Sequence, residues 1–168
     1  MMKKLSHFLL VSLIIFILFG CGLDDGFENT QVTALDELES IEYFRDGALE
    51  HILEGELNHN GQATGFHYDQ LPTKKGEVIE GTKTEENEFG VYEAEVIVSD
   101  VKKNSNGGKS TFFPDKWDTQ NVIDAINESY DARTYINGNT YEGITSDGLV
   151  IRMYLDQQDK IISAFPVY

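Results

Sequence analysis

The chain has 168 residues, and its 29 Asp and Glu outnumber its 13 Lys and Arg, so its formal net charge is −16. This length suits one globular domain with an extension. The acidic excess argues against nucleic-acid binding driven by overall charge, because such a protein repels nucleic acid at long range. Cys21 is the only cysteine, which excludes a disulfide within the chain.

The first twenty residues have the pattern of an export signal. Two lysines at positions 3 and 4 precede an apolar run over residues 8–19, and Gly20 follows it. The run is too short for a membrane-spanning helix, which needs about 20 apolar residues. A basic start, a short apolar segment and a small residue are typical of a signal peptide. We therefore predict that residues 1–20 are a lipoprotein signal peptide.

The four residues Leu18 to Cys21 have the pattern of a lipobox, which predicts a lipid on Cys21. The alternative is an ordinary secretory signal that happens to end near a cysteine. A lipidated Cys21 carrying a second acyl chain would hold the chain stably on a membrane. We therefore expect the membrane as a partner and the cell membrane, lipid-anchored and extracytoplasmic, as the location.

The segment after Cys21 is predicted to be a tether. Residues 22–34 are rich in Asp, Gly, Asn and Thr. A helical spacing of apolar residues begins at Leu35, and a second short helix is expected over residues 48–57. Residues 58–65 form a polar turn. We assign a lipidated tether with its helix to residues 21–45 and a single domain to residues 46–168.

The second half of the chain predicts one clear helix and several strands. The helix is expected over residues 118–130, because Val122, Ile123 and Ile126 share one face. A polar, flexible loop is expected over residues 102–108. Strands are expected, from their alternating patterns and intervening turns, over residues 92–98, 140–145, 149–155 and 161–167. The predicted fold class is α+β: N-terminal helices, then a small antiparallel sheet with a packed helix.

Three histidines follow the signal segment and lie close together in sequence: His51, His59 and His67. His51 is expected at a helix end and His67 at the start of a strand. Two imidazoles on opposite sides of a phosphodiester can act as general base and general acid. The alternative is that all three are surface histidines. A zinc site is disfavoured, since the gaps lack the usual ligand spacing and no cysteine assists.

The segment Gly107 to Thr111 resembles the end of a phosphate-binding P-loop. The motif fails, because Lys103 stands where its first glycine belongs and Pro114 interrupts the helix that must follow. Lys109, beside two hydroxyl residues, is still a candidate phosphate contact; its alternative is a solvated loop lysine. Lys109 also belongs to a locally basic segment inside the acidic chain.

Several short motifs together resemble the bacterial EndoU nuclease family. They are His51-Ile52-Leu53-Glu54-Gly55, Gly65-Phe66-His67, Lys109 to Pro114, the helix after Trp117, and Ser163-Ala164-Phe165-Pro166. No single motif is specific, but their order, spacing and C-terminal position are. The resemblance covers residues 46–168 and implies the nuclease fold that EndoU shares in outline with barnase-like and colicin-like nucleases.

The resemblance implies a metal-independent, cofactor-free endoribonuclease whose catalytic residues are His51, His67 and Lys109. His67 would accept the ribose 2′-OH proton, His51 would protonate the leaving 5′-oxygen, and Lys109 would stabilise phosphoryl charge. Ser110 and Thr111 are expected at the substrate. The products would be a 2′,3′-cyclic phosphate and a 5′-OH.

The resemblance also assigns Ser163 and Phe165 to the uracil base, although Phe165 lacks the hydroxyl group of the tyrosine frequent in relatives and could instead be a core residue. RNA is the implied substrate, and a toxin role would add a cognate immunity protein as partner. The alternatives are a non-catalytic lipoprotein binding module and an acidic partner-binding domain that keep this fold.

Overall fold

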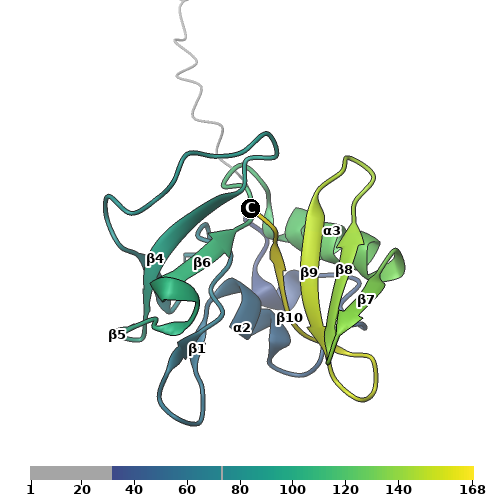
Figure 1. The fold of residues 1–168 in the computed structure, drawn as a ribbon, viewed down its shortest axis with the longest axis horizontal. Coiled ribbons are helices and arrows are strands. Elements are labelled where there is room, and N and C mark those ends of the chain that lie inside the picture. The colour runs from purple at the N-terminus through teal and green to yellow at the C-terminus, as the bar shows by residue number, and fades with distance from the viewer. Residues whose placement is uncertain (1–31, 73) are drawn as a thin grey trace, which may run out of the picture.

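A computed structural model describes residues 32–72 and 74–168 of the chain. The predicted signal peptide, Cys21 and most of the tether lie outside the described residues. Figure 1 shows two antiparallel sheets beside each other, with the longer helix behind the sheet on the right and the shorter helix low in the middle of the view. No helix within the described residues has both the length and the apolar character needed to cross a bilayer.

The C-terminal sheet contains four antiparallel strands in the order β10-β9-β8-β7. They are β7 (Thr134–Asn137), β8 (Thr140–Ile144), β9 (Val150–Leu155) and β10 (Ile161–Pro166). Short turns join successive strands, which is why the sheet is a meander. The three strands predicted here are confirmed, and β7 is an additional edge strand whose residues are all exposed.

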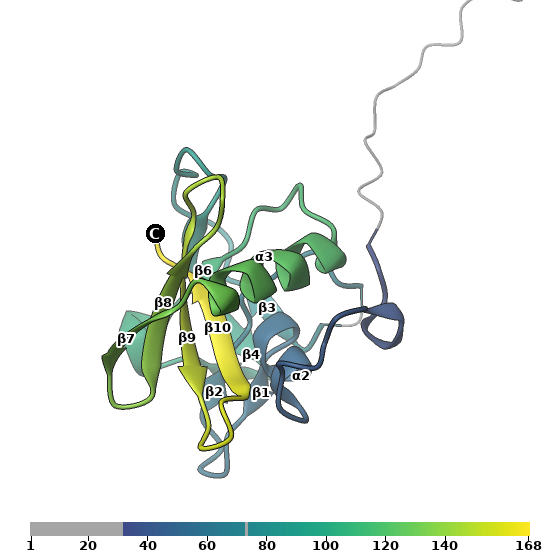
Figure 2. The same ribbon diagram turned by 90° about the vertical axis from the view of Figure 1, so that its right-hand side faces the viewer.

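Helix α3 (Thr119–Asp131) packs on one face of this sheet, as Figure 2 shows. Asp118 caps it by accepting a hydrogen bond from the Thr119 amide, while the Asn121 side chain accepts one from the Asp118 amide. Val122, Ile123 and Ile126 are fully buried and share a core with residues of β9 and β10. The predicted helix and its apolar stripe are therefore confirmed.

The other sheet is built on β4 (Tyr92–Val98), whose residues alternate between buried and half-buried as predicted. Strands β3 (Gly76–Val78), β5 (Val101–Lys102) and β6 (Lys109–Phe112) pair with β4. Phe66, Tyr92 and Phe112 belong to a second hydrophobic core on this side. β6 is the strand that meets β10 between the two sheets.

The helix predicted from Leu35 is wrong: only one 3₁₀ turn, η1 (Leu35–Glu37), forms there. Leu38 is extended and Ser40 has a φ of +57°, so the helical backbone cannot continue. The second predicted helix is confirmed only in its first part, since α2 spans Ala48–Leu53. Gly55 has a φ of +80°, a left-handed conformation that prevents the helix from continuing to residue 57.

A small hairpin follows α2, formed by β1 (Glu56–Leu57) and β2 (Ala63–Thr64). The predicted polar turn is thus the tip of this hairpin plus β2. The predicted flexible loop over residues 102–108 starts in β5 and contains a second 3₁₀ segment, η2 (Ser105–Gly108). The α+β class is confirmed, but the described N-terminal helices are short and two main sheets form instead of one.

Candidate active site

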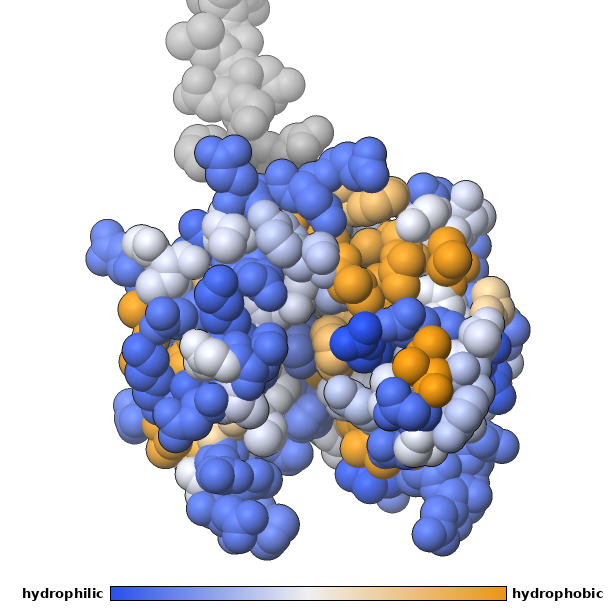
Figure 3. Space-filling view, viewed as in Figure 1, coloured by the Kyte–Doolittle hydropathy of each residue, from blue (hydrophilic) through white to orange (hydrophobic). Residues whose placement is uncertain are grey.

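A cleft of about 670 Å³ lies where the two halves of the domain meet. Its size is in the range of small-molecule binding sites. Its lining includes the predicted catalytic and substrate residues, which come from distant parts of the chain: His51, His67, Lys109, Ser110, Thr111, Ser163 and Phe165. Figure 3 shows a hydrophilic surface over the half that carries β4 and β6 and a hollow beside it.

His51 sits in the last turn of α2 and is held at both ring nitrogens. Its Nδ1 lies 3.0 Å from Oε1 of Glu56, and its Nε2 lies 3.1 Å from Oγ of Ser163. A carboxylate can only accept, so Nδ1 carries a proton. Nε2 accepts from the Ser163 hydroxyl when the ring is neutral and donates to it when the ring is charged.

Burial lowers the pKa of His51, and the hydrogen bond and charge of Glu56 oppose this by raising it. The positive charges of Lys103 and Arg45 lower the His51 pKa further. Glu56 therefore favours the charged imidazolium in a site that otherwise disfavours it.

His67 is buried and lies after β2 in a segment without regular secondary structure, so the prediction that it begins a strand is wrong. Its amide donates to the Ile52 carbonyl at 2.7 Å, and its own carbonyl accepts from the Phe113 amide at 2.9 Å. These bonds hold the segment between α2 and the end of β6. The backbone of His67 is therefore hydrogen-bonded on both sides although it lies outside regular structure.

The His67 ring donates a hydrogen bond from Nδ1 to the Thr111 carbonyl at 2.8 Å. A carbonyl oxygen cannot donate, so Nδ1 is protonated and Nε2 is left as a proton acceptor. Burial, followed by the charge of Lys103, holds the His67 pKa well below its usual value. A lowered pKa favours the neutral ring, which is the state that a general base needs.

Phe165 on β10 stacks on the His67 ring, with ring centroids 5.0 Å apart and planes 20° apart. It is partly buried and lines the cleft. A β-bulge in β10 between Ile161 and Ser163 sets the register in which Ser163 and Phe165 reach the cleft while Ala164 joins the core. Phe165 therefore contacts a proposed catalytic residue and is not in the main hydrophobic core.

Gly65 makes the close approach of the two histidine segments possible. A Cβ on Gly65 would lie 1.9 Å from the carbonyl oxygen of His51, and its φ is +71°. Both conditions require glycine. The Gly65-Phe66-His67 motif thus has a steric basis: it lets the Phe66 amide donate to the His51 carbonyl at 3.0 Å.

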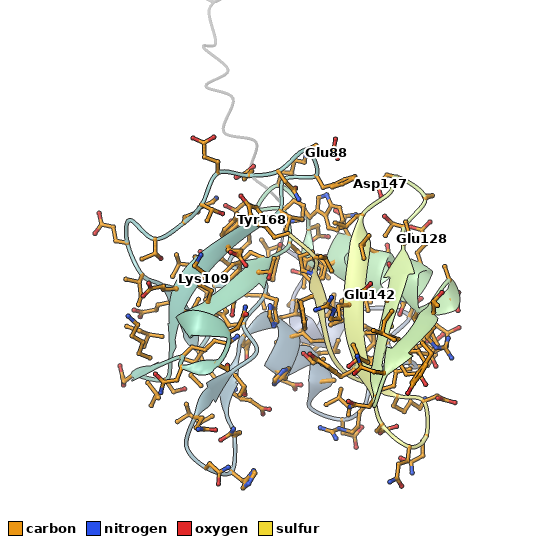
Figure 4. All side chains as sticks on the ribbon, viewed as in Figure 1. Glu88, Lys109, Glu128, Glu142, Asp147 and Tyr168 are labelled. Carbon is orange, nitrogen blue, oxygen red and sulfur yellow. The ribbon has the colours of Figure 1, made fainter. Side chains whose placement is uncertain are left out.

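Lys109 begins β6, where it pairs with Glu95 across the sheet. Its Nζ lies 3.2 Å from Oε2 of Glu93, and its side chain is partly exposed. Figure 4 shows Lys109 on the half opposite to Glu142 of β8. Lys109, for which a solvated position in a loop was the alternative, therefore lies in a strand at the cleft.

The two hydroxyl residues after Lys109 make hydrogen bonds to other residues of the protein. Ser110 is buried and donates from Oγ to the Gly65 carbonyl at 3.0 Å. Thr111 is also buried, and its carbonyl orients His67. Both line the cleft, but these contacts indicate support of the histidine segment in the free protein.

His59 lies exposed at the tip of the β1–β2 hairpin and does not line the cleft. Among residues 32–72 and 74–168, no group of three or more His, Cys, Asp or Glu is placed to hold a metal ion. The residues that sequence analysis missed are Glu56 and Lys103. A carboxylate just after the helix that bears His51 was a weak signal for the first, and nothing in the sequence distinguished the second from neighbouring lysines.

The domain that carries this cleft coincides with the region that a family model matches. The family model described as bacterial EndoU nuclease matches residues 45–168. This chain belongs to the bacterial EndoU nuclease family. The matched region contains both main sheets, α2, α3 and every cleft residue named above.

A relative described as "Toxin", from Bacillus cereus, is 48% identical to this EndoU-family chain over 132 residues. The match covers 79% of this chain but only 24% of the relative, so the chain spans about a quarter of that protein's length. No solved structure matches the chain.

Proposed function

We propose that this EndoU-family chain is an endoribonuclease that cleaves single-stranded RNA by transesterification, with His67 as general base and His51 as general acid. The observation that carries the proposal is the contrast between the two imidazoles. Both rings have a protonated Nδ1, but His67 donates to a neutral carbonyl and His51 to a carboxylate. A carboxylate stabilises an imidazolium and a carbonyl does so far less.

In the proposed reaction, Nε2 of His67 takes the proton of a ribose 2′-OH. The 2′-oxygen forms a bond to the adjacent phosphorus while the bond from phosphorus to the 5′-oxygen breaks. Charged His51 gives the proton on its Nε2 to that 5′-oxygen and releases Ser163. The products are a 2′,3′-cyclic phosphate and a 5′-OH end. The nucleophile belongs to the substrate and is already positioned.

Lys109 is proposed to stabilise the negative charge that grows on the phosphoryl oxygens. Its ammonium is partly exposed and paired with Glu93 in the free protein. Such an exposed ion pair is weak, so a phosphate can take the place of the carboxylate. The Lys109 ammonium can therefore exchange the Glu93 carboxylate for a phosphate of the substrate.

Ser163 and Phe165 are proposed to contact the base and favour uridine. Phe165 presents an aromatic ring beside the general base, and Ser163 carries a hydroxyl group beside the general acid. Stacking tolerates every base, so the hydroxyl group would have to supply the preference. Cleavage of four oligonucleotides that differ only in the base before the scissile phosphate measures this preference.

The test of the proposed function is incubation of the purified full chain with labelled RNA in EDTA, with detection of cyclic-phosphate ends. Alanine at His51 or His67 should lower the rate by roughly 10²–10⁴-fold. Lys109→Ala should also lower it sharply. His59→Ala is the matched control and should cleave normally, since His59 lies outside the cleft.

An RNA with deoxyribose at the scissile position should resist cleavage, because it lacks the nucleophile. Inhibition by EDTA together with damage from His59→Ala would support a metal site instead. A chain that binds RNA but never cuts it would support the non-catalytic binding module.

We further propose that the chain acts outside the cytoplasm, anchored by a lipid on Cys21, as a toxin with a cognate immunity protein. The support is the signal-like segment that ends at Cys21 and the 48% identity to a protein named "Toxin". Expression with and without a candidate immunity protein, followed by growth and RNA integrity, tests the toxin role.

A further inference from the structure

Lys103 is a buried lysine of the cleft to which the proposed mechanism assigns no role. It follows β5, and its residue exposure is 7%. Its amide donates to the Val96 carbonyl at 3.0 Å, so the backbone is fixed to β4. Lysine is among the residues least often buried without a partner. Its position at the cleft therefore calls for an explanation.

The ammonium of Lys103 holds the segment that leads to His67. Its Nζ donates to Oγ of Ser110 at 2.8 Å and to the Gly65 carbonyl at 3.3 Å. Ser110 in turn donates to the same Gly65 carbonyl. These three bonds join the loop after β5, the strand β6 and the glycine two residues before His67. Movement of Gly65 would break two of them.

The positive charge of Lys103 has no negative partner in the part of the chain that the structure describes. No described carboxylate lies within ion-pair distance of its Nζ, whereas Lys109 on the same cleft pairs with Glu93. Burial lowers the pKa of Lys103 to about 8, so most of the group is still charged at neutral pH. An uncompensated buried charge is costly unless a ligand supplies the opposite charge.

We propose that Lys103 is an anion-binding and positioning residue of this cleft: it pins Gly65 to Ser110 and offers a buried positive charge to a phosphate of the RNA. The inference rests on the proposed function for its ligand class, a phosphodiester. It adds a second cation to Lys109, one that is already free of carboxylates and desolvated before the substrate arrives. Such preorganised charge needs little rearrangement on binding.

The same charge acts on both imidazoles. Among the groups around His67, Lys103 and His51 lower the imidazole pKa while the Thr111 carbonyl raises it. Around His51, Glu56 raises the pKa while Lys103 and Arg45 lower it. Removing the Lys103 charge should therefore raise both pKa values. A bound phosphate should partly cancel that charge and act in the same direction, which helps His51 to become the acid.

The test is binding of inorganic sulfate, whose charge is constant near neutral pH, to the full chain, followed by NMR. Lys103→Met removes the charge but keeps an unbranched apolar stem, and Lys103→Arg keeps the charge. Lys116→Met is the matched control, because Lys116 is an exposed lysine outside the cleft and its loss changes the net charge equally. We expect sulfate binding to weaken roughly tenfold or more in Lys103→Met, and not in Lys116→Met.

The histidine titrations give the second readout. Lys103→Met should raise the titration midpoints of His51 and His67, Lys103→Arg should restore them, and Lys116→Met should leave them unchanged. If Lys103→Met does not fold, the same proposal can be tested on the parent chain. Bound sulfate should raise the titration midpoint of the Lys103 ammonium. None of these readouts needs RNA cleavage, so they separate this proposal from the proposed function.

Sulfate binding by Lys103→Met as tight as by the parent, with unchanged histidine midpoints, would overturn the proposal and leave Lys103 a structural residue. An unchanged Lys103 midpoint in the parent at saturating sulfate would do the same.

Discussion

Oε1 of Glu56 lies 3.0 Å from Nδ1 of His51 and favours the charged form of this imidazole against the effect of burial. Glu56 follows Gly55, whose left-handed backbone ends the α2 segment and leads directly into β1. His67 has no carboxylate at the corresponding nitrogen, only the Thr111 carbonyl. The different partners are the physical basis for the acid role proposed for His51 and the base role proposed for His67.

Glu56→Gln should move the alkaline limb of the kcat/KM profile to lower pH. This limb reports loss of the proton from His51, whose pKa burial already lowers and Glu56 raises. Without the Glu56 charge the pKa falls further, so activity is lost at a lower pH on titration upward. Because the Glu56 side chain is 50% exposed, solvent screens its charge and the shift should be small.

Glu50→Gln on the exposed face of α2 is the control for Glu56→Gln and should leave the profile unchanged. An alkaline limb that stays in place in Glu56→Gln, or that moves upward, would remove His51 from the acid role.

Phe165→Leu should weaken substrate binding more than it slows the chemical step. The Phe165 ring stacks on His67 and lines the cleft, so its loss removes an aromatic surface for a base. A stacked base contributes about 1–3 kcal/mol, which corresponds to a rise in KM of roughly 5- to 150-fold. Steady-state kinetics on a uridine-containing oligonucleotide give KM and kcat separately for the parent and the variant. Tyr135→Leu, on the exposed edge strand β7, is the control, and equal effects of the two changes would refute base stacking at Phe165.

Ile126→Ala should destabilise the fold by about 2–5 kcal/mol. Ile126 is fully buried in the core between α3 and the C-terminal sheet, so truncation leaves a cavity. Equilibrium urea unfolding followed by circular dichroism gives the free energy of unfolding. Ile136→Ala, at a side chain that is 44% exposed, should change it by less than about 0.5 kcal/mol. A loss of similar size in both variants would mean that α3 does not pack as described.

Cys21→Ala should release the chain from membranes or block its processing. The expected anchor is a lipid on the only cysteine, and alanine cannot carry it. Fractionation of cells into membrane and soluble parts, with mass spectrometry of the mature N-terminus, provides the measurement. Ser12→Ala within the apolar run is the control. A Cys21→Ala chain as membrane-bound and as processed as the parent argues for a different anchor.

The elements with strong local signals were predictable from sequence. Helix α3 has an apolar stripe and an Asp cap, most of β4 alternates between apolar and polar residues, and the last three strands are separated by turn residues. In each case a period of 3.6 or 2 residues and the chemistry of the ends are contained in a short window. The short pieces were not predictable: β1, β3 and β6 form because β2 or β4 offers a partner, which no local pattern encodes.

By itself the sequence determined which reactive side chains and motifs are present: two histidines near a glycine-rich segment, Lys109 followed by two hydroxyl residues, and the Ser163 to Pro166 segment. Their combination identifies the family. Only the tertiary structure decided that His51 and Ser163, 112 positions apart, share a hydrogen bond. It also decided that Glu56 and Lys103 act on the histidines. The reason is physical: pKa values and tautomers depend on burial and on contacts within a few ångströms, and distance along the chain does not specify either.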